Sequence, residues 1–93
     1  MTQNYIISYD LNGNVPTHAQ MDKHLHAATE AYGRILETVW YARTDKTTKE
    51  VYDYVDRILS ANDRLIVARS SDAWFRNLLV NQPSLQQAWS LAA

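Results

Sequence analysis

The sequence predicts a two-layer α/β sandwich with the element order strand, helix, strand, strand, helix, strand, followed by a helical tail. Three observations support this fold class. Two segments with helical apolar spacing each begin with a Thr-x-x-Gln or Thr-x-x-Glu capping motif, and β-rich segments flank them. Two such helices can cover one face of a sheet. With 93 residues and no low-complexity stretch, the chain has the size of one small domain.

The first strand is expected over residues 5–9, where aromatic and β-branched side chains follow one another without a charge. Asp10 closes this run, and Asn12-Gly13 supplies residues typical of a turn. The first helix is expected at about Thr17 to Tyr32, with a capping box at its start and Gly33 as a left-handed C-terminal cap. Its apolar stripe comprises Met21, Leu25, Ala28 and Tyr32.

Residues 34–44 are rich in β-formers, but neither face of a single flat strand would be wholly apolar. A bend or bulge near Glu37-Thr38 would let each half bury its own face. A very tight hairpin at the same place would do so equally well. The sequence is compatible with both arrangements.

A second helix is expected from the Thr47–Glu50 capping box to about Ser60. Asn62-Asp63 has the composition of a turn. Residues 64–69 then predict a last strand with an apolar centre and an arginine at each end. The buried stripe of the helix comprises Val51, Val55, Ile58 and Leu59.

Residues 70–93 form a C-terminal tail rich in aromatic residues. Ser71 or Asp72 is expected to cap a short helix, residues 81–83 to interrupt it, and Ser84 with Gln87 to cap a terminal helical turn. So much apolar surface is not left in water, so the tail is expected either to fold over the open face of the sheet or to cross to a partner subunit. Its large apolar residues are Trp74, Phe75, Leu78, Leu79, Leu85 and Trp89.

This order of elements predicts a sandwich of the ferredoxin-like kind. Residues 1–69 are assigned to that domain, and residues 70–93 to the helical aromatic tail that packs on it or on a partner. A chain of this size buries roughly 60 to 65% of the surface that it exposes when unfolded. Burying more surface against a second copy would stabilise it, so a homodimer is expected.

Charge and composition restrict the possible functions. Nine Lys and Arg against ten Asp and Glu disfavour a strongly electrostatic nucleic-acid binder, although a dimer can still build a local basic edge. The chain has no cysteine, which excludes disulfides, thiolate metal sites and thiol nucleophiles. We find no signal peptide and no apolar run of membrane-spanning length, so a soluble, cytoplasmic protein is expected.

Asp10 is the strongest candidate for chemistry, because a carboxylate at the end of a buried strand beside a polar loop is a common metal ligand. Mg²⁺ often takes only one or two carboxylates, and a two-fold dimer would supply a pair. Asp10 is therefore the predicted metal ligand and catalytic residue, with a plain turn aspartate as the alternative. The residues that follow do not make a calcium EF-hand, since Met21 stands where that loop requires Glu.

Four residues are predicted to bind substrate: Ser8 and Asn12 beside Asp10, and Arg34 and Arg43 at strand ends. If the arginines converge in a dimer, their guanidinium groups can hold phosphates. If they remain scattered, they are ordinary charges that keep strand edges from pairing wrongly.

The remaining polar and aromatic candidates favour structural roles. His18, His24 and His26 all fall on the first helix without the (i, i+4) spacing of a chelating pair, so we expect solvated histidines and no metal site. The three tryptophans are expected to be core or interface anchors rather than platforms for stacked bases.

Four short segments together resemble a superfamily of small proteins: residues 5–12 (YIISYDLN), the Tyr32-Gly33 pair, residues 36–44 (LETVWYART) and residues 60–67 (SANDRLIV). The superfamily contains the small subunit of CRISPR adaptation (the Cas-two family), the virulence-associated VapD toxins and the SinR-like bacterial and phage proteins, and the likeness is greatest to the SinR-like group. The resemblance covers about residues 4–69. It implies a ferredoxin-like fold, a homodimer, and Asp10 at the position of the strand-end aspartate that binds a divalent metal in members that cut nucleic acid.

Two hypotheses about function follow. In the first, the protein is a small dimeric nucleic-acid-associated protein, a Mg²⁺-dependent endonuclease in which paired Asp10 carboxylates hold the metal. In the second, it is a non-catalytic dimer that binds a protein, nucleic acid or nucleotide, as a toxin–antitoxin, phage or defence-system partner. The near-neutral charge favours the second hypothesis, and the family resemblance favours the first.

Overall fold

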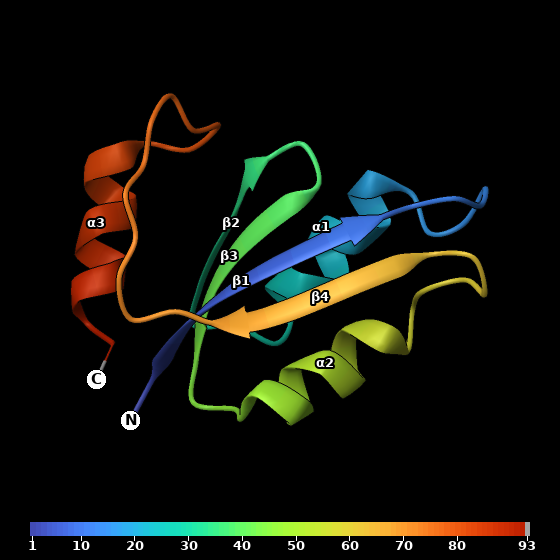
Figure 1. The fold of residues 1–93 in the computed structure, drawn as a ribbon, viewed down its shortest axis with the longest axis horizontal. Coiled ribbons are helices and arrows are strands. Elements are labelled where there is room, and N and C mark those ends of the chain that lie inside the picture. The colour runs from blue at the N-terminus through green and yellow to red at the C-terminus, as the bar shows by residue number, and fades with distance from the viewer. Residues whose placement is uncertain (93) are drawn as a thin grey trace.

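The computed structural model describes the backbone of residues 1–92 and the side chains of residues 1–30 and 33–92. Four strands form one antiparallel sheet in the order β2-β3-β1-β4 (Figure 1). The elements are β1 (Gln3–Asp10), α1 (His18–His26), β2 (Ala31–Leu36), β3 (Val39–Thr44), α2 (Thr48–Asp56), β4 (Arg64–Arg69) and α3 (Gln82–Ser90).

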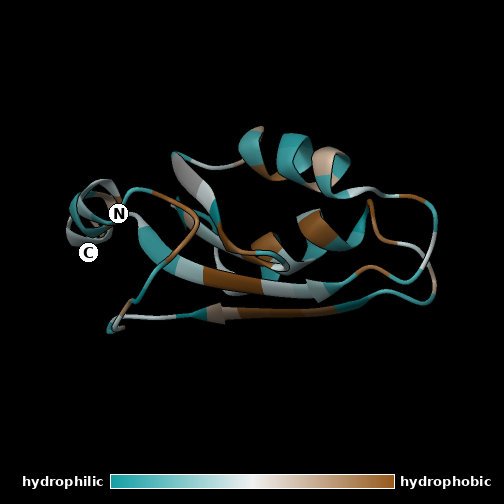
Figure 2. Ribbon diagram, turned by 90° about the horizontal axis from the view of Figure 1, so that it is seen from above, coloured by the Kyte–Doolittle hydropathy of each residue, from teal (hydrophilic) through white to brown (hydrophobic). Residues whose placement is uncertain are grey.

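Helices α1 and α2 lie side by side over one face of the sheet, and Figure 2 shows the two layers from above. We call this the helix face of the sheet and the opposite one the outer face. Alternate residues of β1 and β3 point into the layer between helices and sheet, as the two-residue period of a strand requires. The core there comprises Tyr5, Ile7, Tyr9, Met21, Leu25, Trp40, Ala42, Val51 and Val55. The predicted two-layer arrangement of helices and strands is confirmed at this level.

Helix α1 begins as predicted but ends earlier. Thr17 and Gln20 form the reciprocal capping box. The helix stops at His26, whereas the sequence predicted an end near Tyr32, because the chain from Glu30 onward pairs with β3 instead. The Glu30 N–H donates to the carbonyl of Arg43 at 2.9 Å. Gly33 lies inside β2 opposite Tyr41, so its predicted role as a left-handed cap is wrong.

Strands β2 and β3 form the very tight hairpin, with Glu37-Thr38 as its two-residue turn. The ladder also shifts register between Arg34 and Leu36, so a bulge accompanies the hairpin. This explains why residues 34–44 had no single apolar face. Ile35 is buried on the outer face, and Trp40 is buried on the helix face.

Helix α2 has the predicted Thr47–Glu50 capping box but ends at Asp56 instead of near Ser60. The Ser60 N–H donates to the Asp63 carboxylate at 2.8 Å, which fixes a turn where a further helical turn was expected. Ile58 and Leu59 still pack on the core from this turn. Strand β4 has the predicted bounds.

The tail differs from its prediction in secondary structure. Residues 70–81 contain neither a helix nor a strand, so the short helix expected after Ser71 or Asp72 is not formed. Helix α3 is capped by Asn81, whose side chain accepts a hydrogen bond from the Ser84 N–H at 3.0 Å. Pro83 lies in the first turn, where a missing N–H costs nothing and a fixed φ favours the helix. The proline that seemed to interrupt a helix therefore helps to begin one.

The tail folds over the outer face of its own sheet, one of the two expected locations. Leu85 is buried there against Ile35 and Tyr41. The ring of Trp89 stacks on that of Tyr41 with centroids 5.4 Å apart and meets Phe75 edge-on at 5.5 Å. Trp74 remains 96% exposed.

Candidate functional site

Asp10 is the last residue of β1 and points to the outer face, two residues beyond Ser8 and four beyond Ile6. Its side chain is 60% exposed. The nearest cation is Arg64, directly opposite on β4, whose Nη1 lies 3.7 Å from Oδ2 of Asp10. At this exposure the ion pair contributes little to stability, about 0 to 1 kcal/mol. The carboxylate is therefore accessible to solvent and to a ligand.

A shallow hollow of about 160 Å³ lies beside Asp10, between β1 and β4. Ser8, Asp10, Arg64 and Ile66 line it from the outer face. Ile66 is 67% exposed, although it lies in the middle of a strand. The tail thus covers the outer face around Ile35 and Tyr41 and leaves the Asp10 end of that face open.

Asn12 holds the loop that follows Asp10. Its backbone N–H donates to the Asp63 carboxylate at 2.7 Å, and its side-chain Nδ2 donates to the carbonyl of Asn62 at 2.8 Å. The hydrogen bonds from the Asn12 and Ser60 N–H groups lower the pKa of Asp63. Asn12 therefore ties two loops together at the Asp10 end of the sheet, with its side-chain NH₂ group engaged in that contact.

Arg34 lies on the helix face of the sheet and not beside Asp10. Its Nη2 donates to the Asp22 carboxylate of α1 at 3.3 Å. The indole N–H of Trp40 donates to the other oxygen of Asp22 at 3.1 Å. Because Asp10 points to the opposite face, Arg34 and Asp10 of one chain cannot contact the same phosphate.

Arg43 lies on the outer face but at the far end of the sheet, opposite Asn4. Asp10 lies six positions further along β1 than Asn4, which is about 20 Å along a strand. The Nε atom of Arg43 is buried without a hydrogen-bond partner among the described residues. Within one chain, the structure therefore brings Ser8 and Asp10 together and keeps both predicted arginines away from them.

A groove that the sequence did not reveal lies between α1 and β2. Its volume is about 480 Å³, and Lys23, His26 and Arg34 are among its lining residues. Lys23 and His26 lie three residues apart on one side of α1. Arg34 joins them because α1 packs beside β2. The sequence predicts solvated histidines on this helix, and it gives no sign that Lys23 lies near Arg34.

His24 is also not the solvated histidine that was expected. Its ring stacks on Tyr54 of α2 with centroids 4.0 Å apart and planes 9° from parallel. Its Nε2 lies 2.6 Å from the carbonyl oxygen of Tyr54, and the Tyr54 hydroxyl donates to the carbonyl of His24 at 2.6 Å. This pair joins the two helices.

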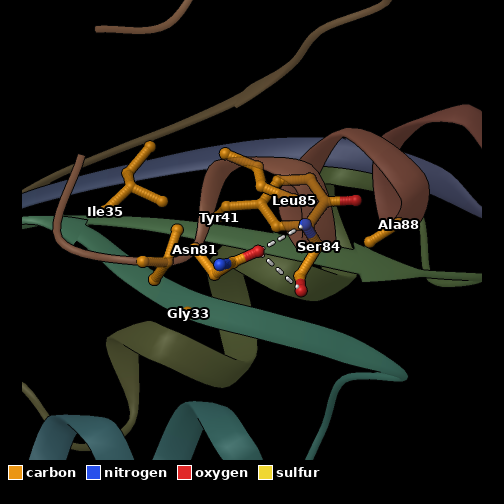
Figure 3. A pocket seen from close by; sticks show the side chains of 8 residues that line it. Gly33, Ile35, Tyr41, Asn81, Ser84, Leu85 and Ala88 are labelled. Atoms are coloured by element: carbon orange, nitrogen blue, oxygen red, sulfur yellow. Dashed lines mark hydrogen bonds between the residues drawn. The ribbon is translucent and has the colours of Figure 1, made fainter. Parts of the chain in front are cut away.

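The tail encloses a third hollow, shown in Figure 3, of about 230 Å³. Gly33, Ile35 and Tyr41 form its floor, and Leu85 and Ala88 of α3 lie over it. A β-carbon on Gly33 would come within 3.0 Å of a methyl group of Val80, which also lines the hollow. The walls are mainly apolar, so this hollow is part of the packing between tail and sheet.

Residues 1–92 contain no cluster of three or more His, Asp or Glu side chains placed to share one metal ion. A Mg²⁺ ion does not require such a cluster, because it commonly keeps several waters and binds one or two carboxylates. None of the helices in the same residues is long and apolar enough to span a bilayer. Comparison of the chain with protein-family models, with curated proteins and with solved structures found no match.

Proposed function

We propose that this protein is a homodimeric nucleic-acid-associated phosphodiesterase in which Asp10 of each subunit serves as a Mg²⁺ ligand at the interface between subunits. One observation carries the proposal: Asp10 stands exposed on the part of the outer face that the tail leaves open, beside the exposed apolar side chain of Ile66. An exposed carboxylate beside an exposed apolar side chain is suited to a ligand site that a second subunit completes.

The strand order supports the proposed family. An antiparallel sheet in the order β2-β3-β1-β4, with α1 and α2 on one face, is the arrangement expected for a ferredoxin-like sandwich. We propose to assign the chain to that fold and, because residues 5–12, 36–44 and 60–67 resemble it, to the superfamily of SinR-like, VapD and Cas-two proteins. In that assignment Asp10 takes the place of the strand-end aspartate.

The residues around Asp10 fit Mg²⁺ in part. One chain offers a single exposed carboxylate, with the Ser8 hydroxyl on the same face, and a two-fold axis near the hollow would provide the second carboxylate. A bound Mg²⁺ would supply Lewis-acid polarisation of a phosphate and a lowered pKa of its water ligand. Arg64, next to Asp10, would then be available to pair with a phosphate oxygen.

The experiment measures cleavage of labelled RNA and DNA oligonucleotides in Mg²⁺ or Mn²⁺. We compare the wild-type chain with Asp10→Asn and, as a matched control, Asp45→Asn, which changes an exposed aspartate just after β3, at the opposite end of the sheet. Losing a metal ligand removes several kcal/mol of transition-state stabilisation, so Asp10→Asn is expected to lower the rate by about a hundredfold or more. Activity that survives Asp10→Asn unchanged would exclude this role of Asp10.

Dimerisation is tested separately by light scattering of the wild-type chain. A mass of two chains is expected at tens of micromolar protein. A monomer at that concentration would contradict the proposal, because one chain presents only one Asp10.

A non-catalytic dimer that binds a protein, nucleic acid or nucleotide is the second candidate. It is favoured by the ion pair that already engages Asp10 with Arg64, and by the 96% exposure of Trp74 beside a groove in the tail. Trp74 lines this groove together with Phe75 and Trp89, and aromatic side chains are enriched at contact surfaces. Absence of cleavage on every RNA and DNA substrate, with either metal, would favour this candidate over the first.

A further inference from the structure

The groove between α1 and β2 has a cationic character that the whole chain lacks. Lys23 and Arg34 line it from two elements, and Asp22 is the only acidic side chain among the described residues that line it. Both oxygens of Asp22 are engaged, one with Arg34 and the other with the Trp40 indole N–H. Lys23 therefore leaves the groove with a net positive charge in a chain whose formal net charge is −1.

Arg34 is positioned in advance of any ligand. Its side chain is one-third exposed, and its Nη2 is held by Oδ2 of Asp22 at 3.3 Å. A guanidinium group has five N–H donors in a rigid plane, so several donors remain beyond the one given to Asp22. A guanidinium group held in this way, next to a flexible lysine ammonium group, can donate hydrogen bonds to the oxygens of a phosphate.

We propose that this groove binds a phosphate group, with Arg34 as the oriented donor and Lys23 as the mobile charge. The phosphate group can be part of a nucleic-acid backbone or of a free ion such as inorganic pyrophosphate. The nucleic-acid source rests on the proposed function, whereas phosphate binding itself does not. The site lies on the helix face, so it is separate from Asp10 on the outer face.

The first measurement is a titration of the ¹⁵N-labelled full chain with inorganic pyrophosphate at low salt. The amide signals of α1 and β2 are expected to shift with a common dissociation constant. Shifts confined to the Asp10–Arg64 hollow, or no shifts at all, would overturn the proposal.

The second measurement compares Lys23→Glu with Lys49→Glu, which makes the same change of charge at an exposed lysine of α2. Replacing an attractive surface charge by a repulsive one is expected to weaken pyrophosphate binding about tenfold in the first variant and little in the second. Arg34→Lys keeps the charge but loses the fork, and we expect it to weaken binding severalfold. Equal affinities of Lys23→Glu and Lys49→Glu would overturn the proposal.

A third measurement distinguishes a nucleic-acid phosphate from a free phosphate, and binding at the groove from chemistry at Asp10. Fluorescence anisotropy with a labelled single-stranded RNA gives the slope of log affinity against log salt. Lys23→Glu should reduce that slope by about 0.7 if one backbone phosphate is released from the groove. An unchanged slope together with weaker pyrophosphate binding would assign the groove to free phosphates. Asp10→Asn should leave pyrophosphate binding at the groove unchanged, so a failure of the Asp10 proposal and a failure of this one are distinguishable.

Discussion

The contact between the tail and the sheet depends on a buried hydrogen-bond chain that one substitution can break. The Tyr41 hydroxyl donates to Oδ1 of Asn4 at 2.7 Å, and Nδ2 of Asn4 donates to the carbonyl of Trp89 at 3.0 Å. Tyr41 is 2% exposed and Asn4 is 4% exposed. Tyr41→Phe removes the hydroxyl and leaves a buried acceptor unsatisfied. We expect the free energy of unfolding to fall by about 2 kcal/mol, within the range of about 1 to 3 kcal/mol for such losses.

The same hydroxyl makes the free energy of unfolding depend on pH, and Tyr41→Phe should lose that dependence. Burial raises the pKa of Tyr41 to about 12, against an ordinary value of 10.0, and the nearby Arg43 charge offsets part of that effect. Because the folded pKa is the higher one, the stabilisation is complete below pH 10 and is lost as the pH rises from 10 to 12. At pH 11 the titration of this hydroxyl has lowered the free energy of unfolding by the equivalent of about one pKa unit, roughly 1.4 kcal/mol. The advantage of the wild type over Tyr41→Phe should therefore shrink from about 2 to roughly 0.6 kcal/mol.

The assay is equilibrium unfolding in urea at pH 8 and pH 11, followed by circular dichroism and tryptophan fluorescence. Tyr52→Phe is the matched control, because Tyr52 is 41% exposed and its change should alter stability by about 0.5 kcal/mol or less at pH 8. Comparing variant with wild type at each pH cancels the titration of the other tyrosines. A Tyr41→Phe effect as small as that of the control at pH 8, or one equally large at both pH values, would refute this account of how the tail is held.

Three further predictions concern the tail, a helix start and the loop after Asp10. Trp89→Ala should cost about 2 to 3 kcal/mol and Trp74→Ala less than about 0.5, and urea midpoints in the reverse order would contradict the observed packing. Thr47→Ala should cost about 1 kcal/mol through the lost cap, with Thr47→Ser as the conservative control. Since the pKa of Asp63 is lowered, the stability that it contributes should be lost as the pH falls below its ordinary value of 3.8. Asp63→Asn should lack that acid-dependent loss, and an unchanged acid profile would count against the contact.

The fold was predictable where local chemistry and tertiary packing agree. The two capping boxes begin α1 and α2 at the expected residues, because the cap satisfies the backbone of the helix itself. The end of α1 was not predictable from local spacing, since residues 31–36 satisfy their backbone by pairing with β3. The start of α3 was missed for a different reason. Taken with Asn81 and Gln82, Pro83 predicts a break in the helix, whereas a proline in the first turn favours a helix.

The candidate site could be predicted only as far as one strand determines it. Ser8 and Asp10 share a face because a strand has a two-residue period, which the sequence shows directly. Where the arginines point depends on the bulge between Arg34 and Leu36 and on the sheet order, which are long-range properties. The groove between α1 and β2 forms only when the helix packs beside the strand, so no motif along the chain predicts it.

The two halves of β1 present different surfaces on the outer face of the sheet. Its first half holds the tail through Asn4 and Ile6, and its second half presents Ser8 and Asp10 beside the uncovered part of β4. About 20 Å separates Asn4 from Asp10, so a substitution that loosens the tail should leave any chemistry at Asp10 unchanged. If Tyr41→Phe also changed metal-dependent cleavage at Asp10, the tail would have to reach the Asp10 end of the sheet in the assembled protein.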